Sequence, residues 1–193
     1  MQLRGTETEK NLLKAFAGES QARNRYTYFA SEARKAGFEQ ISAIFTETAD
    51  NEKEHAKIFF KYLQESNGVP VTIEAAYPAG KIGTTAENLL AAANGEKEEW
   101  GELYPHFEKI ARKEGFKEIA DSFREIADVE SEHEKRYRKL LDNIKQKAVF
   151  KRKGKVKWKC RNCGYVHEGP EAPEECPACK HPQAFYELLV ENY

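Results

Sequence analysis

The chain carries the pattern Glu-x-x-His twice, as Glu52/His55 and again 78 residues later as Glu130/His133. Residues three apart on a helix lie on one face, a turn above each other, so the Glu and the His of each pair can reach the same point. In helical bundles, two such pairs together with one Glu from each of two further helices build a site for two metal ions. The pattern therefore predicts a two-metal carboxylate site.

A glutamate preceded by glycine lies upstream of each pair, at Glu19 and at Glu96, and Glu99 follows Glu96 after one helical turn. A single Glu-x-x-His in a helix usually marks an exposed face. Two copies in register, each with an upstream glutamate, favour metal ligands instead. The candidate ligands of the bundle are Glu19, Glu52, His55, Glu96, Glu99, Glu130 and His133.

Five carboxylates close to a helical core would repel one another and lose hydration unless cations were bound. Mixed carboxylate and imidazole ligands suit iron or manganese, with positions left open for a substrate. Four of the glutamates already roughly neutralise two divalent ions, so Glu99 adds an anion that favours a more oxidised pair. We infer that Glu99 and His55 compete for one metal as its oxidation state changes.

The internal repeat extends beyond the ligands, because residues 33–38 read Ala-Arg-Lys-Ala-Gly-Phe and residues 111–116 read Ala-Arg-Lys-Glu-Gly-Phe. These segments and the Glu-x-x-His pairs are offset by 78 residues, whereas the upstream Gly-Glu pairs are offset by 77. One extra residue therefore lies between Glu96 and the second segment. Single insertions in helices often form π-bulges at functional sites, so we expect a π-bulge there, with Pro105 as its marker.

Capping boxes at Thr6/Glu9 and Thr84/Glu87, and stop signals at Gly37 and Gly115, divide the first 147 residues into four helices. The expected helices cover about 6–36, 38–65 and 84–114, and a fourth runs from there to about 147. Residues 69–83 contain prolines and glycines and are expected to form a loop. Such a loop is long enough to cross the bundle from end to end, which lets the second and third helices run parallel.

Composition excludes several classes of protein. The net charge of −1 gives no overall electrostatic basis for binding nucleic acid, and no run of about 18 apolar residues is present that would span a membrane. The N-terminus lacks the apolar region of a signal peptide, so we expect a cytoplasmic protein.

Nine basic and no acidic residues lie between 145 and 161. We interpret this stretch as a solvated linker plus a first strand; a patch for nucleic acid or an anionic membrane is the weaker alternative.

All four cysteines lie near the C-terminus, as the two Cys-x-x-Cys pairs Cys160/Cys163 and Cys176/Cys179. This spacing is typical of a tetrahedral four-thiolate site for zinc or a single iron. No histidine follows either pair, which excludes c-type haem attachment. The domain organisation we predict is a metal-binding bundle over 1–147, a basic linker over 148–156 and a four-cysteine domain over 157–193.

With these motifs in place, the chain resembles the rubrerythrin family over essentially its whole length. The resemblance implies a mainly α protein: a four-helix ferritin-like bundle with one long crossover, followed by a small rubredoxin-like β/loop domain. It implies two non-haem irons in the bundle and one iron at the cysteines, where zinc could substitute. It also implies that Glu99 binds one iron in the oxidised protein and that His55 replaces it in the reduced protein. Tyr26 and Tyr104 match tyrosines near the family's site, and we expect them to bind its carboxylates by hydrogen bonds.

The resemblance further implies a peroxidase that reduces hydrogen peroxide to water and protects against oxidative stress. Electrons would pass from the four-cysteine iron to the di-iron site, supplied by an upstream donor such as a reductase or rubredoxin and so indirectly by NAD(P)H. A homodimer or higher homo-oligomer is implied as well, with one subunit's cysteine site near the partner's bundle site. Two alternatives stay open: a ferritin-like ferroxidase, oxidase or iron-handling protein, and a bundle joined to a zinc-ribbon interaction module.

Overall fold

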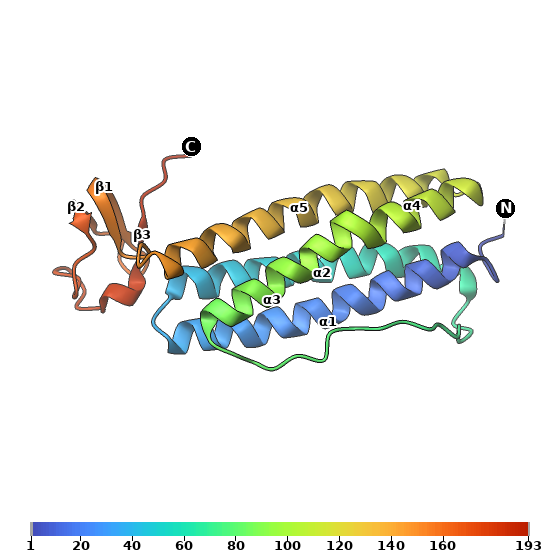
Figure 1. Cartoon of the computed structure of the whole chain (residues 1–193), viewed down its shortest axis with the longest axis horizontal. Helices are drawn as coiled ribbons and strands as arrows, with labels where there is room; N and C mark the ends of the chain where they lie inside the picture. Colours follow the sequence, from blue (N-terminus) through green and yellow to red (C-terminus); the bar gives the residue numbers. More distant parts are fainter. Residues whose placement is uncertain (1, 193) are drawn as a thin grey trace.

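The computed structural model describes residues 2–192 as a long helical bundle with a small sheet domain at one end (Figure 1). This confirms the predicted four-helix bundle, in which the third helix is built from two consecutive segments. The helices are α1 (Glu7–Lys35), α2 (Glu39–Tyr62), α3 (Thr85–Glu98), α4 (Tyr104–Lys113) and α5 (Lys117–Lys145). A short 3-10 turn, Leu63–Ser66, follows α2.

Local signals fix the helix ends. The Thr6 side chain accepts a hydrogen bond from the Glu9 N–H at 3.1 Å, as the predicted cap requires, but the Glu9 carboxylate accepts from the Gly5 N–H instead of reaching back to Thr6. The capping box at Thr84 is complete. Gly37 and Gly115 have φ values of +80° and +88°. This left-handed conformation ends the first helix of each of the two helical hairpins.

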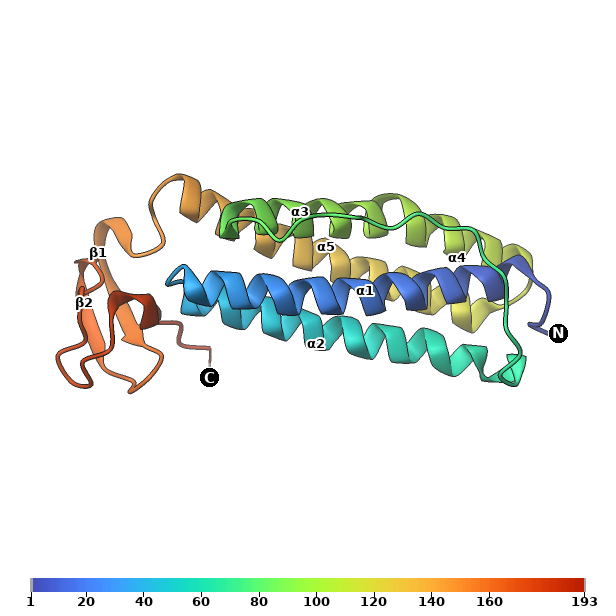
Figure 2. The same cartoon turned by 90° about the horizontal axis from the view of Figure 1, so that it is seen from below.

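The crossover segment, residues 69–84, contains neither helix nor strand and runs along α1 from one end of the bundle to the other (Figures 1 and 2). It leaves the end of α2 and delivers the chain to the start of α3 at the opposite end. Helices α2 and α3 therefore run parallel, as predicted from the length of this segment.

The predicted π-bulge is present. Residues Glu99–Leu103 form a π-helical turn between α3 and α4, and the Tyr104 N–H donates to the Glu99 carbonyl, five residues back. Pro105 follows directly, at the start of α4. The single extra residue of the second repeat is thus absorbed in the turn that carries Glu99.

Two apolar clusters occupy the two halves of the bundle. One contains Tyr26, Phe45 and Tyr137, and the other contains Phe59 and Phe123 among its fully buried side chains. Along α1, α2 and α5, and along α3 with its continuation into α4, the candidate metal ligands fall between these clusters in sequence. The bundle is therefore an apolar core interrupted in the middle by one buried layer of charged groups.

The C-terminal domain is a three-stranded antiparallel sheet in the order β2-β1-β3, with β1 at Lys151–Cys160, β2 at Val166–Glu171 and β3 at Tyr186–Leu188. Strand β1 begins inside the segment expected to be a linker, so residues 151–156 already belong to the sheet. The domain packs on the end of the bundle, where the rings of Phe38 and Phe150 stack with centroids 6.1 Å apart.

Candidate metal centres

Six of the seven predicted bundle ligands come together in two groups that share two members. One group contains Glu19, Glu52, His55 and Glu130, and the other contains Glu52, Glu96, Glu130 and His133. Within each group the possible ligand atoms lie within 4.8 Å of one another. All six residues are buried. Glu52 and Glu130 belong to both groups, so two metal ions held by these groups would share these two carboxylates.

The first group converges on the His55 ring. Its Nδ1 atom lies 2.8 Å from Glu130 Oε1, 3.0 Å from Glu52 Oε2 and 3.8 Å from Glu19 Oε2. These residues come from α1, α2 and α5, and the three-residue spacing of Glu52 and His55 places both on the inner face of α2.

The second group repeats this arrangement around His133. Its Nδ1 atom lies 2.7 Å from Glu130 Oε2, 3.3 Å from Glu52 Oε1 and 4.0 Å from Glu96 Oε1. Each histidine thus faces both shared carboxylates and one upstream glutamate. The two halves of the sequence repeat build two equivalent halves of one site.

The polar atoms of this layer fit a pair of cations. Buried atoms without a hydrogen-bond partner include one oxygen each of Glu19, Glu52 and Glu96, both oxygens of Glu130, and Nδ1 of His133. Burial, and then the charges of Glu130 and Glu52, raise the pKa of Glu19 well above its usual range, and burial and the same two charges raise the pKa of Glu96. Two bound cations would give these atoms partners and offset the repulsion. The donor set therefore suits two metal ions.

Tyr26 and Tyr104 make the hydrogen bonds expected of them. The Tyr26 hydroxyl donates to Glu96 Oε1 at 2.7 Å, and the Tyr104 hydroxyl donates to Glu19 Oε1. Both tyrosines are buried, and burial followed by the neighbouring carboxylates raises each pKa well above the usual range, which keeps the donors protonated. Each bond is made to Oε1, and the Oε2 atom of each carboxylate has no hydrogen-bond partner.

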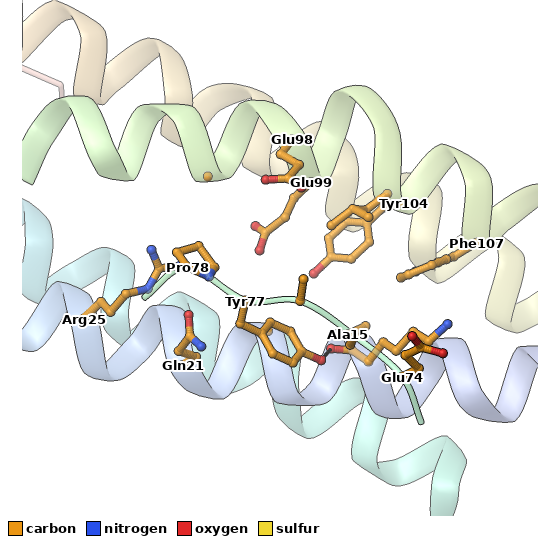
Figure 3. A pocket seen from close by; sticks show the side chains of 16 residues that line it. Ala15, Gln21, Arg25, Glu74, Tyr77, Pro78, Glu98, Glu99, Tyr104 and Phe107 are labelled. Carbon is orange, nitrogen blue, oxygen red and sulfur yellow. Dashed lines mark hydrogen bonds between the residues drawn. The ribbon is translucent and has the colours of Figure 1, made fainter. Parts of the chain in front are cut away.

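Glu99, the seventh predicted ligand, lies outside both groups. It is half-buried in the π-turn, and its carboxylate points into a cavity of about 250 Å³ between α1, the π-turn and the crossover segment (Figure 3). Glu99 and Tyr104 line the inner side of this cavity, and Tyr77 of the crossover segment lines the outer side. The structure therefore has His55 inside the ligand set and Glu99 beside it.

Sequence reasoning missed a polar network on the other side of the π-turn. The Trp100 Nε1–H donates to Glu134 Oε2 at 2.7 Å, and the Arg138 Nε–H donates to Glu134 Oε1 at 2.5 Å. Trp100 follows Glu99 and Glu134 follows His133, so the network ties the π-turn to the helix that carries a ligand. The adjacency of each residue to a predicted ligand was the only signal in the sequence.

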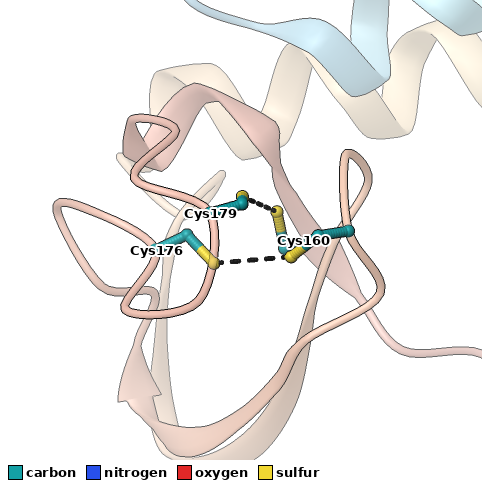
Figure 4. Close-up of side chains that lie close together, drawn as sticks. Cys160, Cys176 and Cys179 are labelled. Atoms are coloured by element: carbon teal, nitrogen blue, oxygen red, sulfur yellow. Dashed lines mark hydrogen bonds between the residues drawn. The ribbon is translucent and has the colours of Figure 1, made fainter.

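The four cysteines come together as predicted: Cys160 ends β1, Cys163 lies in the turn that follows, and Cys176 and Cys179 lie between β2 and β3 (Figure 4). The Sγ atoms of Cys160 and Cys179 are 3.7 Å apart, as are those of Cys163 and Cys176. Sulfurs around a tetrahedral metal with bonds of about 2.3 Å lie about 3.8 Å apart, so these distances fit one ion. Cys160 and Cys176 are buried, whereas Cys163 is exposed. The exposed side gives the site an edge that a partner can approach.

Comparisons with known proteins agree with this division of the chain. Residues 10–141 match the family model described as Rubrerythrin, and residues 158–187 match the model for the rubredoxin-like domain of rubrerythrin. The chain is 58% identical to a rubrerythrin of Porphyromonas gingivalis, covering 99% of this chain and 94% of the relative. It is also 58% identical to a rubrerythrin of Nitratidesulfovibrio vulgaris, covering 99% and 98%.

Solved structures show the same fold. A structure of nigerythrin in a mixed-valence state is 33% identical with a TM-score of 0.63, covering 96% of this chain and 87% of that one. A bacterioferritin of Desulfovibrio desulfuricans is similar in fold alone, at 24% identity and a TM-score of 0.64, covering 74% and 82%. No helix among the described residues is long and apolar enough to span a membrane. The family models and the near full-length relatives show that the chain belongs to the rubrerythrin family of di-iron oxidoreductases.

Proposed function

We propose that the protein is a non-haem di-iron peroxidase that reduces hydrogen peroxide to water. The observation that carries this proposal is a spare carboxylate, Glu99, held beside a complete set of six ligands at the inner end of a cavity. Storage of iron needs no additional carboxylate and no four-cysteine site in the same chain. A redox reaction with a small substrate uses both.

The bundle ligands comprise two that belong to both groups and four that belong to one group each. Glu52 and Glu130 would bridge the two positions, while Glu19 with His55 and Glu96 with His133 would complete them. Iron bound there would supply the two electrons that cleave the O–O bond, and iron at the cysteines would replace them one at a time. The hydroxyls of Tyr26 and Tyr104 fix the terminal carboxylates so that one oxygen of each faces the site.

Glu99 is proposed to move protons and to exchange places with His55. Reduction of hydrogen peroxide to two water molecules takes up two protons with the two electrons. Burial, followed by the charges of Glu130 and Glu52, raises the pKa of Glu99, so its carboxyl holds a proton more readily than an exposed glutamate. In the oxidised protein we propose that Glu99 turns toward the site and becomes a ligand while His55 withdraws.

The electron path is proposed to begin at the exposed edge of the four-cysteine site, at Cys163. A reductase or rubredoxin would deliver electrons that come ultimately from NAD(P)H. We further propose a homodimer in which one subunit's cysteine site lies near the partner's bundle site. The ferroxidase or oxidase alternative would use dioxygen in place of peroxide and would not depend on the cysteine site.

Metal substitution tests this function without altering the sequence. Two preparations are compared, both with iron in the bundle, one with iron and one with zinc at the cysteines. We expect both to react once with peroxide after reduction, and only the first to turn over repeatedly with a reductant. Equal repeated turnover by both would exclude the electron path through the cysteines. Rapid reoxidation by dioxygen with little preference for peroxide would support the oxidase alternative.

A further inference from the structure

Two glycines lie in the interiors of helices that carry metal ligands. Gly18 lies in α1 and Gly95 in α3, each directly before a terminal glutamate ligand, and they occupy matching places in the internal repeat. A glycine inside a helix destabilises the helix relative to alanine. Neither glycine has a positive φ, so the backbone conformation does not require glycine at these positions. Glycine at these two positions is therefore explained by its lack of a side chain.

Both glycines line the cavity that ends at Glu99 and Tyr104. A Cβ atom built on Gly18 would lie 3.7 Å from Tyr77 Cε1 and 3.9 Å from Glu99 Oε1. These are ordinary van der Waals distances, so a methyl group would fit without a clash. It would, however, occupy the space between the crossover segment and the Glu99 carboxylate. A Cβ on Gly95 would face Arg25 Nη2 across the same cavity, at 4.0 Å.

The crossover segment forms the outer wall of this cavity (Figure 3). Residues 74–78 are exposed, so this wall lies at the surface of the molecule. The Tyr77 hydroxyl donates to the Lys14 carbonyl at 2.9 Å and holds the segment against α1. The Tyr77 ring therefore stands between solvent and the gap over Gly18.

We propose that Gly18 and Gly95 keep open the path by which peroxide reaches Glu99, and that Tyr77 limits the size of the molecule that this path admits. The proposal rests on the proposed peroxidase function. The cavity is large compared with hydrogen peroxide, since one water molecule takes about 30 Å³ in the liquid. The gap over Gly18 is narrow enough for one methyl group to touch both of its sides.

The substitution Gly18→Ala distinguishes a role in the peroxide path from a role in packing by its effect on the melting temperature. If Gly18 keeps the path open, alanine should raise the melting temperature while slowing the reaction. If Gly18 is needed for packing, alanine should lower the melting temperature. Alanine favours the helix, so the melting temperature of the metal-free protein should rise by roughly 2–4 °C. The rate of reaction with hydrogen peroxide should fall about threefold and that with tert-butyl hydroperoxide about tenfold or more, since each tenfold corresponds to about 1.4 kcal/mol of barrier. Gly95→Ala should change both quantities in the same directions.

Asn24→Ala is the matched control. Asn24 is an exposed residue of α1 that does not line this cavity. Alanine there also favours the helix and should raise the melting temperature while leaving both peroxide rates unchanged. The double substitution Gly18→Ala with Tyr77→Ala removes the outer wall and should restore the rate with the larger peroxide to at least the wild-type value.

The rate at which azide binds to the iron-loaded protein provides a readout that involves no turnover. Slower azide binding in Gly18→Ala, with a raised melting temperature, supports the path. Unchanged azide and peroxide rates would overturn it, and so would a lowered melting temperature together with slower rates, which would indicate damaged packing. A wild-type protein that binds azide but does not react with peroxide would overturn the proposed function, and the azide rates would still decide the path.

Discussion

At the scale of single residues, the site depends on which oxygen of each glutamate is already occupied. Tyr26 and Tyr104 are related by the internal repeat, and each donates to the Oε1 atom of the glutamate contributed by the other half. Glu96 Oε2 and Glu19 Oε2 are left without partners. Each tyrosine therefore orients a carboxylate before any metal binds.

We expect Tyr104→Phe to weaken metal binding by about 10–100-fold, which is the usual effect of removing a group that orients a metal ligand. The ring remains in the core, and only the donor to Glu19 is lost. Anaerobic titration of the metal-free protein with ferrous ion measures this affinity. Tyr26→Phe is the matched variant and should have a similar effect through Glu96. Wild-type affinity in both variants would show that the tyrosines only fill the core.

At the scale of elements, the sequence determined most of the scaffold. Caps at Thr6 and Thr84 and glycines at the hairpin ends marked the helices, and the unequal offsets of the repeat predicted the π-turn. Other features could not be read from local pattern. The start of strand β1 at Lys151 is one of them, because the apolar alternation of this strand begins only at Val156. The Trp100–Glu134 bond is another, because it joins positions that share no periodicity. The direction of the Glu99 side chain depends on its surroundings and not on its spacing.

The π-turn contributes no buried residue of its own, and Trp100 ties it to α5. Trp100→Phe retains an aromatic ring but removes the N–H donor to Glu134. We expect peroxide turnover to fall about tenfold, about 1.4 kcal/mol in the barrier, because Glu99 would be held less firmly. Iron content should be unchanged. Glu134→Gln retains an acceptor oxygen and should turn over faster than Trp100→Phe; equal turnover in the two variants would contradict the role of the Trp100 bond.

The start of α1 is capped by a carboxylate from the end of α4. The Glu114 side chain accepts hydrogen bonds from the Thr8 hydroxyl and from the N–H groups of Glu7 and Thr8. Burial disfavours the charged carboxylate, but these bonds outweigh burial and lower the pKa of Glu114. The capping interaction is therefore fully present above the unperturbed pKa of about 4.3 and is lost as the pH falls through the lower folded-state value.

Glu114→Gln should accordingly destabilise the metal-free protein by about 1 kcal/mol at pH 7, the usual contribution of a helix cap. The difference in the free energy of unfolding between wild type and variant should shrink below about pH 4, as the wild-type carboxylate takes up its proton. Urea unfolding at several pH values measures this difference. A difference that stays constant from pH 7 to pH 3 would contradict a charged cap.

At the scale of the whole molecule, the bundle and the four-cysteine domain meet at a small contact. Phe38 at the start of α2 and Phe150 before β1 stack on each other, and Gly37 lies close to Ala184. Because the contact joins positions more than 100 residues apart in sequence, no local pattern could reveal it. The chain thus combines a ligand layer built by an internal repeat with a separate four-sulfur site at one end.

Phe150→Ala should loosen the two parts without unfolding either, because Phe150 is only partly buried. We expect faster proteolysis in residues 146–150, with peroxide reduction by the pre-reduced bundle unchanged in a single turnover. Limited digestion followed by mass spectrometry locates the cleavage. If the variant is as resistant as the wild type, the stack does not hold the domains together.

The central claim is that Glu99 makes the bundle a peroxidase and not merely a metal-binding protein. The most direct test is anaerobic stopped-flow mixing of reduced, iron-loaded protein with hydrogen peroxide, for wild type and for Glu99→Ala. We predict rapid reoxidation of the wild type, much faster than with dioxygen, and a reaction slowed by about 100-fold or more in the variant, as expected for loss of a proton-transferring group. Iron content should stay equal in the two proteins. Equal rates in both would contradict the account.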